Sequence, residues 1–445
     1  MKTIKNKIVY EENINNIQGK AIAIVFPESE QEIKNVIKIG NHDVIARGSG
    51  SSFTGAVIPK DSIIIDFSKM NKIIELSASN KTVIVEPGVL LSELNEELEQ
   101  YNLEFPIEPL FGGLETIGGM IAKNAAGNKE IKYNRMLNWI DSLEVINGNG
   151  EHVHVSKSDL GDFVGMEGTT GIIMQAKLRL THRRTRSLTI LKSNNLMDIF
   201  VLNRKLRMNM DVSSIDLINP EISVFLGLEK KYHLFIELEH DRGNFRGENY
   251  RKYIKLKNNF YKKAAMEGYW YMSNAKFLIE SLQDFLIYLE ENNIPYLGQL
   301  ASGVVYPLFK PEQVSKIEEA AKFAKRLRGR VAYNFGIGLT KKDFLDIGEA
   351  DLIRRIKKRH DPHDKLNRNK LIESKFKAEP ISEKEEKEQQ KDEEVKEAVA
   401  QTVGDIIAQS ETMTLKKQEP ELSEEEREKI KKIASGFFAG GGNSA

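Results

Sequence analysis

Small residues dominate the stretch ETIGGMIAKNAAGNKEIK at residues 115–132, and small residues let a backbone come close to another molecule. Residues 116–119 are expected to open a turn, residues 120–123 to form a short helix, and residues 124–127 to close it. Backbone of this kind can lie against a flat, charged group, with its N–H groups converging on that group. Glycine pairs also mark ordinary turns, so this stretch by itself leaves both interpretations open.

A second glycine-rich segment, RGSGSSFTG at residues 47–55, interleaves glycine with serine. Its N–H groups and hydroxyls have the chemistry of a loop that cradles phosphates. A Rossmann dinucleotide-binding loop would run directly into a helix, but residues 56–59 are expected to be extended and to end at a proline. The GK[ST] ending of a P-loop is also absent. Neither common phosphate-binding motif therefore explains this segment.

Two further turns of the same kind occur in this half of the chain. GMEGTTG at residues 165–171 leads into a β-branched run, and VEPGVL at residues 85–90 follows another apolar run. Glycine-rich loops at several strand ends of one folded unit favour a single extended cofactor over a set of unrelated turns.

The composition excludes several classes of protein. Of 445 residues, 40% are hydrophobic and 29% are charged, and the length suggests two or three globular domains. Without cysteine the chain can form no disulfide and no thiolate metal site, which fits a reducing compartment. We recognise no signal peptide and no apolar run near the ~20 residues that span a bilayer, so we expect a cytoplasmic protein. A formal net charge of zero gives no reason to expect nucleic-acid binding.

The order of the elements that must position these loops predicts an α+β fold. Apolar runs predict strands, apolar residues at helical spacing predict helices, and NGNG at residues 147–150 predicts a hairpin. The expected strands are residues 21–26, 43–46, 62–67, 82–86, 139–146, 151–155 and 172–180, with helices at 29–39 and 90–101.

A basic patch at residues 181–186 marks a domain boundary, and its Arg184 and Arg186 are expected to be solvated. Beyond it we expect a second α+β domain, a basic turn-rich closing segment, and a charged, partly helical tail at residues 377–445. In the second domain the expected strands are residues 188–191 and 234–238, and the expected helices are residues 249–266 and 311–327.

Six motifs in order resemble those of a known family: RGSGSSFTGAVIP, VEPGVLLSELN, TIGGMIAKNAAGN, WIDSLEVINGNGE, GMEGTTGII and DPHDKLNRNK. They resemble FAD-binding oxidoreductases of the vanillyl-alcohol oxidase (PCMH) type, in the branch of D-lactate dehydrogenases and glycolate oxidase flavoprotein subunits. The resemblance implies a two-lobed FAD-binding domain at residues 16–183 and a ferredoxin-like cap at residues 187–373. The closing segment of the cap, residues 349–373, would return to the flavin.

The resemblance also implies which residues hold FAD. The first loop would bind the pyrophosphate, the middle segments would line the cofactor, the third loop would contact the adenosine side, and the closing segment would reach the flavin. In that order these residues are Arg47, Gly48, Ser49, Gly50, Ser51 and Ser52; Pro87, Gly88, Thr116, Gly118, Gly119, Ala122, Asn124 and Gly127; Glu167, Gly168, Gly171 and Ile173; and Asn367. Some relatives attach FAD covalently through a histidine in the first loop; Ser51 stands there in this chain, so we expect non-covalent FAD.

The substrate site that the resemblance implies has lost its ionisable groups. Two metal-binding histidines of the family correspond to Gln299 and Tyr306 in GQLASGVVY, and a carboxylate and a base correspond to Asn334 and Phe335 in NFGIG. The substrate arginine corresponds to Ser273. We therefore expect no metal, and only the neutral Tyr306, Asn334 and Gln299 remain as candidate catalytic residues. His152 with His154, and His360 with His363, are expected to be surface residues rather than replacements.

Three functions remain open. The first is an FAD-dependent oxidoreductase acting on an unidentified hydroxylated or otherwise oxidisable substrate, and the second is an FAD-binding electron-transfer or scaffold subunit without its own dehydrogenase activity. The third is a sugar-linked or aryl-alcohol oxidase of the wider superfamily. A partner is expected among iron–sulfur or other electron-acceptor subunits, which could hold the chain at a membrane surface. SGFFAGGGNSA at residues 435–445 resembles the start of an iron–sulfur segment whose cysteines are replaced by Gly436, Ala439 and Gly442, or it is a flexible end.

Overall fold

The structure, a computed structural model, describes residues 8–13, 17–38, 42–110, 112–331 and 333–373. The expectations for the tail at residues 377–445, including its iron–sulfur-like end, lie outside the described residues. The described ranges combine helices with four sheets, which confirms the expected mixture of helix and sheet. None of the helices in these ranges has the length and apolar character needed to cross a bilayer.

A small parallel sheet begins the chain, in the order β1 (Lys20–Val25), β3 (Lys60–Asp66), β2 (Asp43–Arg47). Helix α2 (Glu30–Lys38) connects β1 to β2 and buries the apolar stripe that its spacing predicts, so all three strands and the helix were anticipated within two residues at each end. The glycine-serine loop at residues 47–55 follows directly from the end of β2.

A five-stranded antiparallel sheet follows, in the order β4 (Ile73–Ser77), β5 (Thr82–Val85), β9 (Gly171–Arg179), β7 (Ile140–Asn147), β8 (His152–Ser156). The predicted hairpin joins β7 to β8, with Ile146 opposite His152 and Gly150 at a φ of +79°. That positive φ is one that glycine adopts without strain, which explains its place in the turn.

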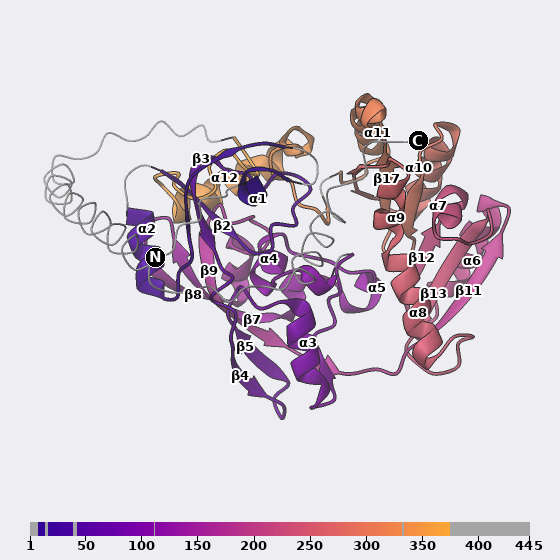
Figure 1. The fold of residues 1–445 in the computed structure, drawn as a ribbon, viewed down its shortest axis with the longest axis horizontal. Coiled ribbons are helices and arrows are strands. Elements are labelled where there is room, and N and C mark those ends of the chain that lie inside the picture. Colours follow the sequence, from indigo (N-terminus) through magenta and orange to yellow (C-terminus); the bar gives the residue numbers. More distant parts are fainter. Residues whose placement is uncertain (1–7, 14–16, 39–41, 111, 332, 374–445) are drawn as a thin grey trace, which may run out of the picture. The chain divides into compact units, whose positions relative to one another are not determined.

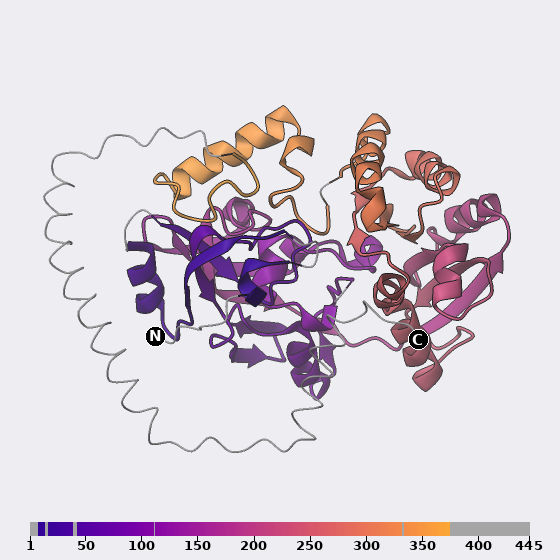
Figure 2. The same cartoon turned by 45° about the horizontal axis from the view of Figure 1, so that its top comes forward.

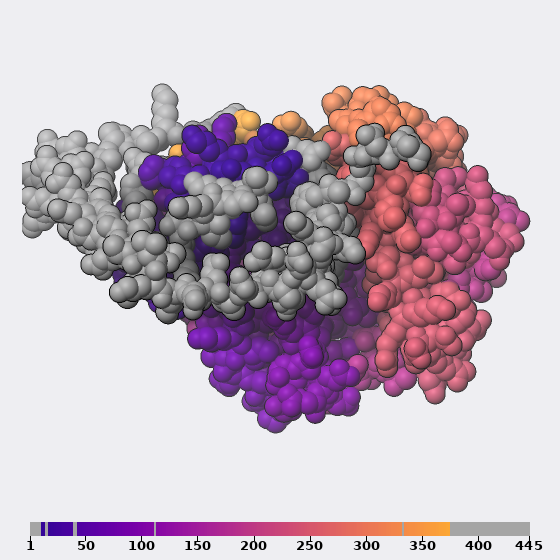
Figure 3. Space-filling view, viewed as in Figure 1, coloured from indigo at the N-terminus to yellow at the C-terminus, as the bar shows by residue number. Residues whose placement is uncertain are grey.

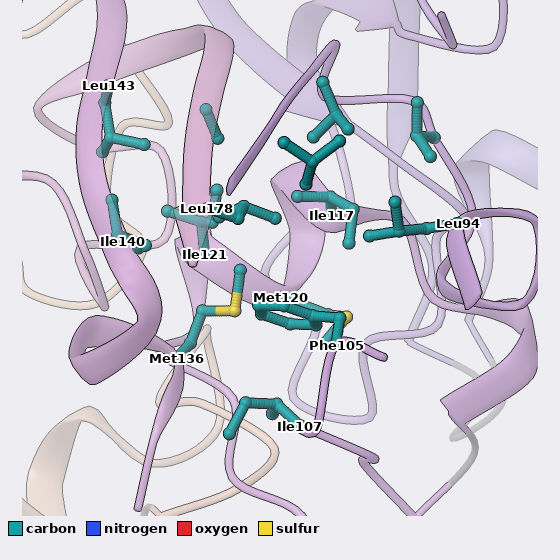
Figure 4. Packing of buried hydrophobic residues seen from close by; sticks show 14 of the residues in the cluster. Leu94, Phe105, Ile107, Ile117, Met120, Ile121, Met136, Ile140, Leu143 and Leu178 are labelled. Atoms are coloured by element: carbon teal, nitrogen blue, oxygen red, sulfur yellow. The ribbon is translucent and has the colours of Figure 1, made fainter. Parts of the chain in front are cut away.

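Helices α3 (Leu91–Glu99) and α4 (Ile117–Ala122) share one hydrophobic core with this sheet. Figure 4 shows Met120 of α4 beside Phe105 and Met136, and all three side chains are buried. Because α4 begins at Ile117, Gly118 and Gly119 lie inside its first turn. The expected separate turn at residues 116–119 is thus part of the helix, and the predicted start at residue 120 was too late.

The region expected to form the cap contains an antiparallel sheet in the order β11 (Ser187–Ser193), β13 (Tyr232–Leu238), β12 (Val212–Ile218), β16 (Tyr296–Gln299), β17 (Val304–Phe309), β14 (Tyr271–Met272). Its residues, pink to orange, form a contiguous surface in the space-filling view (Figure 3). The helices are α6 (Leu196–Leu206), α7 (Pro220–Phe225), α8 (Gly247–Asn258), α9 (Phe260–Met266), α10 (Ile279–Glu291) and α11 (Val314–Arg326).

Two expectations for the cap region were wrong. The single helix expected at residues 249–266 is α8 followed by α9, because Asn259 between them leaves helical geometry with a ψ of 3°. Arg186 is not solvated: its side chain is only 12% exposed and donates to Oε2 of Glu104 at 2.8 Å. Buried arginine needs such partners, and Nε of Arg186 also lies 3.4 Å from Glu237 of β13, so Arg186 connects Glu104 to the later sheet.

Helix α12 (Ile347–His360) and the residues after it lie beside β2 and β3, as both views of the ribbon show (Figures 1 and 2). The backbone N–H of Asn367 donates to the carbonyl of Val44 at 2.9 Å, and that of Val44 donates to Lys365 at 2.7 Å. The closing segment thereby returns to the strand that carries the glycine-serine loop.

The remaining elements are short. They are α1 (Ile8–Glu11), α5 (Glu130–Tyr133), β6 (Leu103–Glu104) paired with β10 (Thr181–His182), β15 (Ala275–Lys276), and the 3-10 helices η1 (Gly112–Leu114), η2 (Met136–Trp139), η3 (Lys157–Asp162), η4 (Pro311–Gln313) and η5 (Lys342–Phe344).

Candidate cofactor-binding site

One cavity brings the separated loops together. It encloses about 990 Å³ of atom-free space, part of which is open to solvent. Most of the residues predicted to hold a cofactor line it: Arg47, Gly48, Ser49, Gly50, Ser51, Ser52, Pro87, Thr116, Gly118, Gly119, Ala122, Glu167, Gly168, Gly171 and Ile173. Segments more than 100 residues apart in the sequence thus form one concave surface, although the contacts of each residue with a cofactor stay a prediction.

The first loop offers hydrogen-bond donors to this cavity. Within the described part of the chain, the backbone N–H groups of residues 49–52 donate to no protein acceptor. Arg47 lies 3.6 Å from Asp66 and next to the loop, since a Cβ built on Gly50 would lie 2.2 Å from its guanidinium. Burial lowers the pKa of Arg47 and the Asp66 carboxylate opposes this, so the arginine stays charged. Free N–H groups next to a buried cation suit an anionic ligand.

In the second segment, the backbone N–H groups of three residues are bonded within the protein. The N–H groups of Ile117 and Gly118 donate to the carbonyls of Val89 and Pro87, at 2.8 Å each. That of Gly119 donates to Oγ1 of Thr116 at 3.2 Å. Of the two interpretations left open for this stretch, convergence of these three N–H groups on a ligand does not fit, because protein acceptors occupy them. The glycines of this segment instead allow close packing. A Cβ on Gly118 would lie 2.7 Å from Cβ of Pro87.

Four predicted residues do not line the cavity, and each has a structural role. A Cβ on Gly88 would lie 2.0 Å from the carbonyl oxygen of Phe67, and one on Gly127 would lie 2.3 Å from that of Glu108. Asn124 has a φ of +49°, and its Oδ1 accepts the N–H of Leu137 at 3.1 Å. Asn367 donates from Nδ2 to the carbonyl of Glu167 at 2.6 Å. These residues fix the loops rather than form the cavity wall.

Glu167 reaches toward the cap rather than toward open space. Its carboxylate accepts the N–H of Ile337 at 2.5 Å and that of Gly338 at 2.9 Å. Burial raises the pKa of this carboxyl, and the two N–H donors oppose that effect. The residue lines the cavity, as predicted, but its charged group is bonded to the protein.

An aromatic wall was missed by sequence reasoning. Phe53 and Phe335 both line the cavity, and their rings stack with centroids 4.7 Å apart and an angle of 20° between planes. Phe53 lies within the RGSGSSFTG motif, so an aromatic residue inside a predicted phosphate loop was the available signal. The other lining residues not anticipated are Ala46, Ala56, Val57, Phe67, Glu115 and Lys123, the last two forming an ion pair at 2.7 Å.

The three candidate catalytic residues form a buried cluster of their own. The hydroxyl of Tyr306 donates to Oε1 of Gln299 at 3.2 Å and accepts from Nδ2 of Asn334 at 2.6 Å. Their exposed fractions are 0%, 1% and 6%, and none of them lines the cavity. Burial raises the pKa of Tyr306 far above its ordinary value. The phenol therefore stays protonated, and no phenolate is present to accept a proton. Only their neighbour Phe335 reaches the cavity.

Metal binding depends on how the histidine and carboxylate side chains of the described residues are arranged. Among the residues that the structure describes, no group of three histidine, aspartate or glutamate side chains is arranged to hold a metal ion. His152 and His154, both exposed, each lie 2.7 Å from the carboxylate of Glu144. His360 contacts Asp162 at 2.8 Å and is largely buried, contrary to the expected surface position.

Comparison with known proteins agrees with this geometry. Residues 21–156 match the family described as FAD binding domain. The chain is 31% identical to D-2-hydroxyglutarate dehydrogenase of Stutzerimonas stutzeri, over 37% of this chain and 38% of the relative. It is 36% identical to the mitochondrial D-lactate dehydrogenase [cytochrome] of Arabidopsis thaliana, over 35% and 30%, and 29% identical to glycolate oxidase subunit GlcD of Bacillus subtilis, over 39% and 40%.

These matches span two fifths or less of the length of each relative. They confirm the resemblance to FAD-linked oxidoreductases of the D-lactate dehydrogenase and glycolate oxidase branch, with FAD as the cofactor.

Proposed function

We propose that the FAD binding domain of this chain serves an FAD-dependent oxidoreductase that holds FAD non-covalently in the cavity described above. The observation that carries the proposal is the convergence of the separated loops on one cavity, with the N–H groups of residues 49–52 free to donate. A dinucleotide carries a charged pyrophosphate between two flat, largely apolar ends. The cavity is lined both by the loop that carries these N–H donors and by the stacked aromatic rings of Phe53, which follows the donors in that loop, and Phe335.

The chain's own groups would act by binding and orienting. The N–H groups of residues 49–52 would donate to the pyrophosphate, with Arg47 next to the loop contributing positive charge. Gly119 would allow close approach, because the only heavy atom within 4 Å of a Cβ built there is Oγ1 of Thr116, at 3.1 Å. Phe53 and Phe335 would exclude water. When bound, FAD supplies the acceptor for two electrons from an oxidisable substrate.

The substrate side of the proposal departs from D-2-hydroxy acid oxidation. That chemistry needs a base for the hydroxyl proton, and Phe335 at the cavity has no group that accepts one. We infer a small donor molecule whose oxidation needs no proton acceptor from the cap. The ferredoxin-like character of the cap, and an electron-acceptor subunit as partner, belong to this proposal as well; one relative is named as a subunit.

A second function is favoured by one specific observation. The hydroxyl of Tyr306 is hydrogen-bonded to both Gln299 and Asn334, and none of the three residues lines the cavity. Their polar groups therefore cannot contact a substrate bound in the cavity. A flavoprotein that only relays electrons or stabilises a complex needs no such group. The alternative is therefore an FAD-binding electron-transfer or scaffold subunit without its own dehydrogenase activity.

The cofactor proposal is tested by titrating FAD into the purified full chain and into two glycine variants. Gly119→Ala adds a methyl group inside a helix, where alanine is favoured, at a residue that lines the cavity; its Cβ would lie 3.1 Å from Oγ1 of Thr116. We expect its FAD affinity to fall by about tenfold or more, equivalent to about 1.4 kcal/mol. Gly161→Ala is the matched control, since a Cβ there meets no atom within 4 Å. Equal affinities for both variants and the wild type would contradict the proposed site.

The two functions are separated by anaerobic mixing of the FAD-loaded protein with candidate donors. D-Lactate, glycolate and D-2-hydroxyglutarate are expected to leave the flavin absorption near 450 nm unchanged. Bleaching by another small donor supports the oxidoreductase, whereas reduction only by a reduced protein partner supports the electron-transfer subunit. Bleaching by any of the three acids would show that the lost base and arginine are not needed.

A further inference from the structure

We propose that Glu167 is a positioning residue whose carboxylate fastens the closing loop, residues 333–339, over the cavity, and that it does not bind the cofactor directly. This deepens the proposed function and depends on it only where cofactor affinity is measured. Glu167 belongs to the third glycine-rich loop, in the N-terminal half of the chain. Its carboxylate accepts hydrogen bonds from two N–H groups of a segment about 170 residues later.

Four segments meet at this single residue. Its N–H donates to the carbonyl of Ala122 at 2.8 Å, and its carbonyl accepts from Nδ2 of Asn367 at 2.6 Å. Its carboxylate accepts from Ile337 and Gly338. The backbone φ of +50° is unusual for a residue with a side chain and is held by these bonds. Glu167 thus connects the α4 segment, the third glycine-rich loop, the closing segment and the closing loop.

The closing loop is shaped to receive the carboxylate. Gly336 has a φ of +78°, and a Cβ there would lie 2.5 Å from Oε1 of Glu167. Gly338 has a φ of +51°, and a Cβ there would lie 2.4 Å from the carbonyl oxygen of Thr54. The two glycines of NFGIG therefore allow the loop to wrap around one carboxylate. Without that carboxylate, two buried N–H groups would lose their hydrogen-bond acceptor, which is unfavourable for a buried donor.

The same contacts set the position of Phe335. The hydroxyl of Thr54 donates to the carbonyl of Phe335 at 3.2 Å, and the N–H of Leu339 donates to the carbonyl of Thr54 at 2.8 Å. With Glu167 holding the residues between these two bonds, the Phe335 ring is fixed against Phe53. The Glu167 carboxylate therefore acts on the cavity through Phe335.

The first test uses the protein without cofactor. Glu167→Gln keeps the size of the side chain but replaces one acceptor oxygen by an NH₂ group that faces an N–H donor. We expect hydrogen–deuterium exchange of peptides covering residues 333–339 to quicken by about tenfold, because a bonded amide there would open more often. Glu115→Gln is the matched control: Glu115 also lines the cavity, but it pairs with Lys123. Unchanged exchange in Glu167→Gln would overturn the proposal, whether or not the protein binds FAD.

The second test is a double-mutant cycle on FAD affinity with Glu167→Gln and Phe335→Leu. If Glu167 acts through Phe335, each single substitution lowers the affinity for FAD by about tenfold, and the double substitution also lowers it by only about tenfold. A direct contact between Glu167 and FAD would instead make the effects multiply to about a hundredfold, and the proposal would fail. If neither the wild type nor any variant binds FAD, the proposed function fails. The hydrogen–deuterium exchange measurement still decides the role of Glu167 in that case.

Discussion

The ring of Phe335 stacks on the ring of Phe53, with 4.7 Å between their centroids. Phe53 belongs to the glycine-serine loop that is predicted to hold a pyrophosphate, and Phe335 belongs to the NFGIG motif, where the resemblance implies a base. An apolar contact therefore stands where proton transfer is expected in related enzymes. At this position the side chain that lines the cavity has no group that can accept a proton.

The buried cluster around Tyr306 is expected to serve stability. Tyr306→Phe removes the acceptor of Asn334 Nδ2 and the donor to Gln299 Oε1 while keeping the ring. We expect the free energy of unfolding in urea to fall by about 1–3 kcal/mol, because buried polar groups lose partners. Tyr101→Phe is the control, since that side chain is 45% exposed and should change stability little. Equal stability of the two variants would mean that the cluster contributes nothing to folding.

The ion network between the N-terminal part and the cap is expected to be far more sensitive. Glu237 is 1% exposed and lies 3.2 Å from Nζ of Lys129 and 3.4 Å from Nε of Arg186. Glu237→Gln removes the negative charge that pairs with two buried cations. We therefore expect the free energy of unfolding, measured in denaturant, to fall by about 3–5 kcal/mol. The exposed pair of Glu318 with Lys322 provides the control, and Glu318→Gln should cost less than about 1 kcal/mol. Similar losses in both variants would contradict this account.

Stability should also depend on pH through Lys341. Burial lowers the pKa of this amine to about 7, against the opposing effect of Glu167. Between about pH 7 and the ordinary lysine pKa of about 10.4, the unfolded chain binds a proton that the native chain does not. The free energy of unfolding should therefore rise with pH across that window, and Lys341→Met should flatten the rise. Lys322→Met, at an exposed site, should leave the slope unchanged. A slope that is the same in Lys341→Met and the wild type would exclude this group as its source.

The sequence carried enough information for the local elements and for the loops. Apolar periodicity located α2 and the strands of both N-terminal sheets except β4, which was missed, and NGNG located the hairpin, because these signals depend on neighbours in the chain. It could not indicate that Gly88 packs on Phe67 or that Glu167 meets Ile337, because those contacts depend on the folded arrangement of distant segments. The break at Asn259 was missed for a related reason: the apolar spacing continues through it while the backbone does not.

The bond between chain and cofactor can be tested directly. Ser51 stands where some relatives have a histidine, and a serine hydroxyl does not form the covalent flavin link of that histidine. We expect acid precipitation of the FAD-loaded protein to leave all of the flavin in the supernatant, and the intact mass of the polypeptide to match its sequence. Flavin that stays with the precipitate, with a correspondingly heavier polypeptide, would contradict non-covalent binding.

The central claim is that glycine-rich segments distant in sequence form one FAD site, and equilibrium titration of FAD into the purified apoprotein tests it most directly. We expect saturable binding of one FAD per chain, seen as quenching or a shift of the flavin signal, and weaker binding in Gly119→Ala but not in Gly161→Ala. A folded protein that stays colourless and takes up no FAD would contradict it.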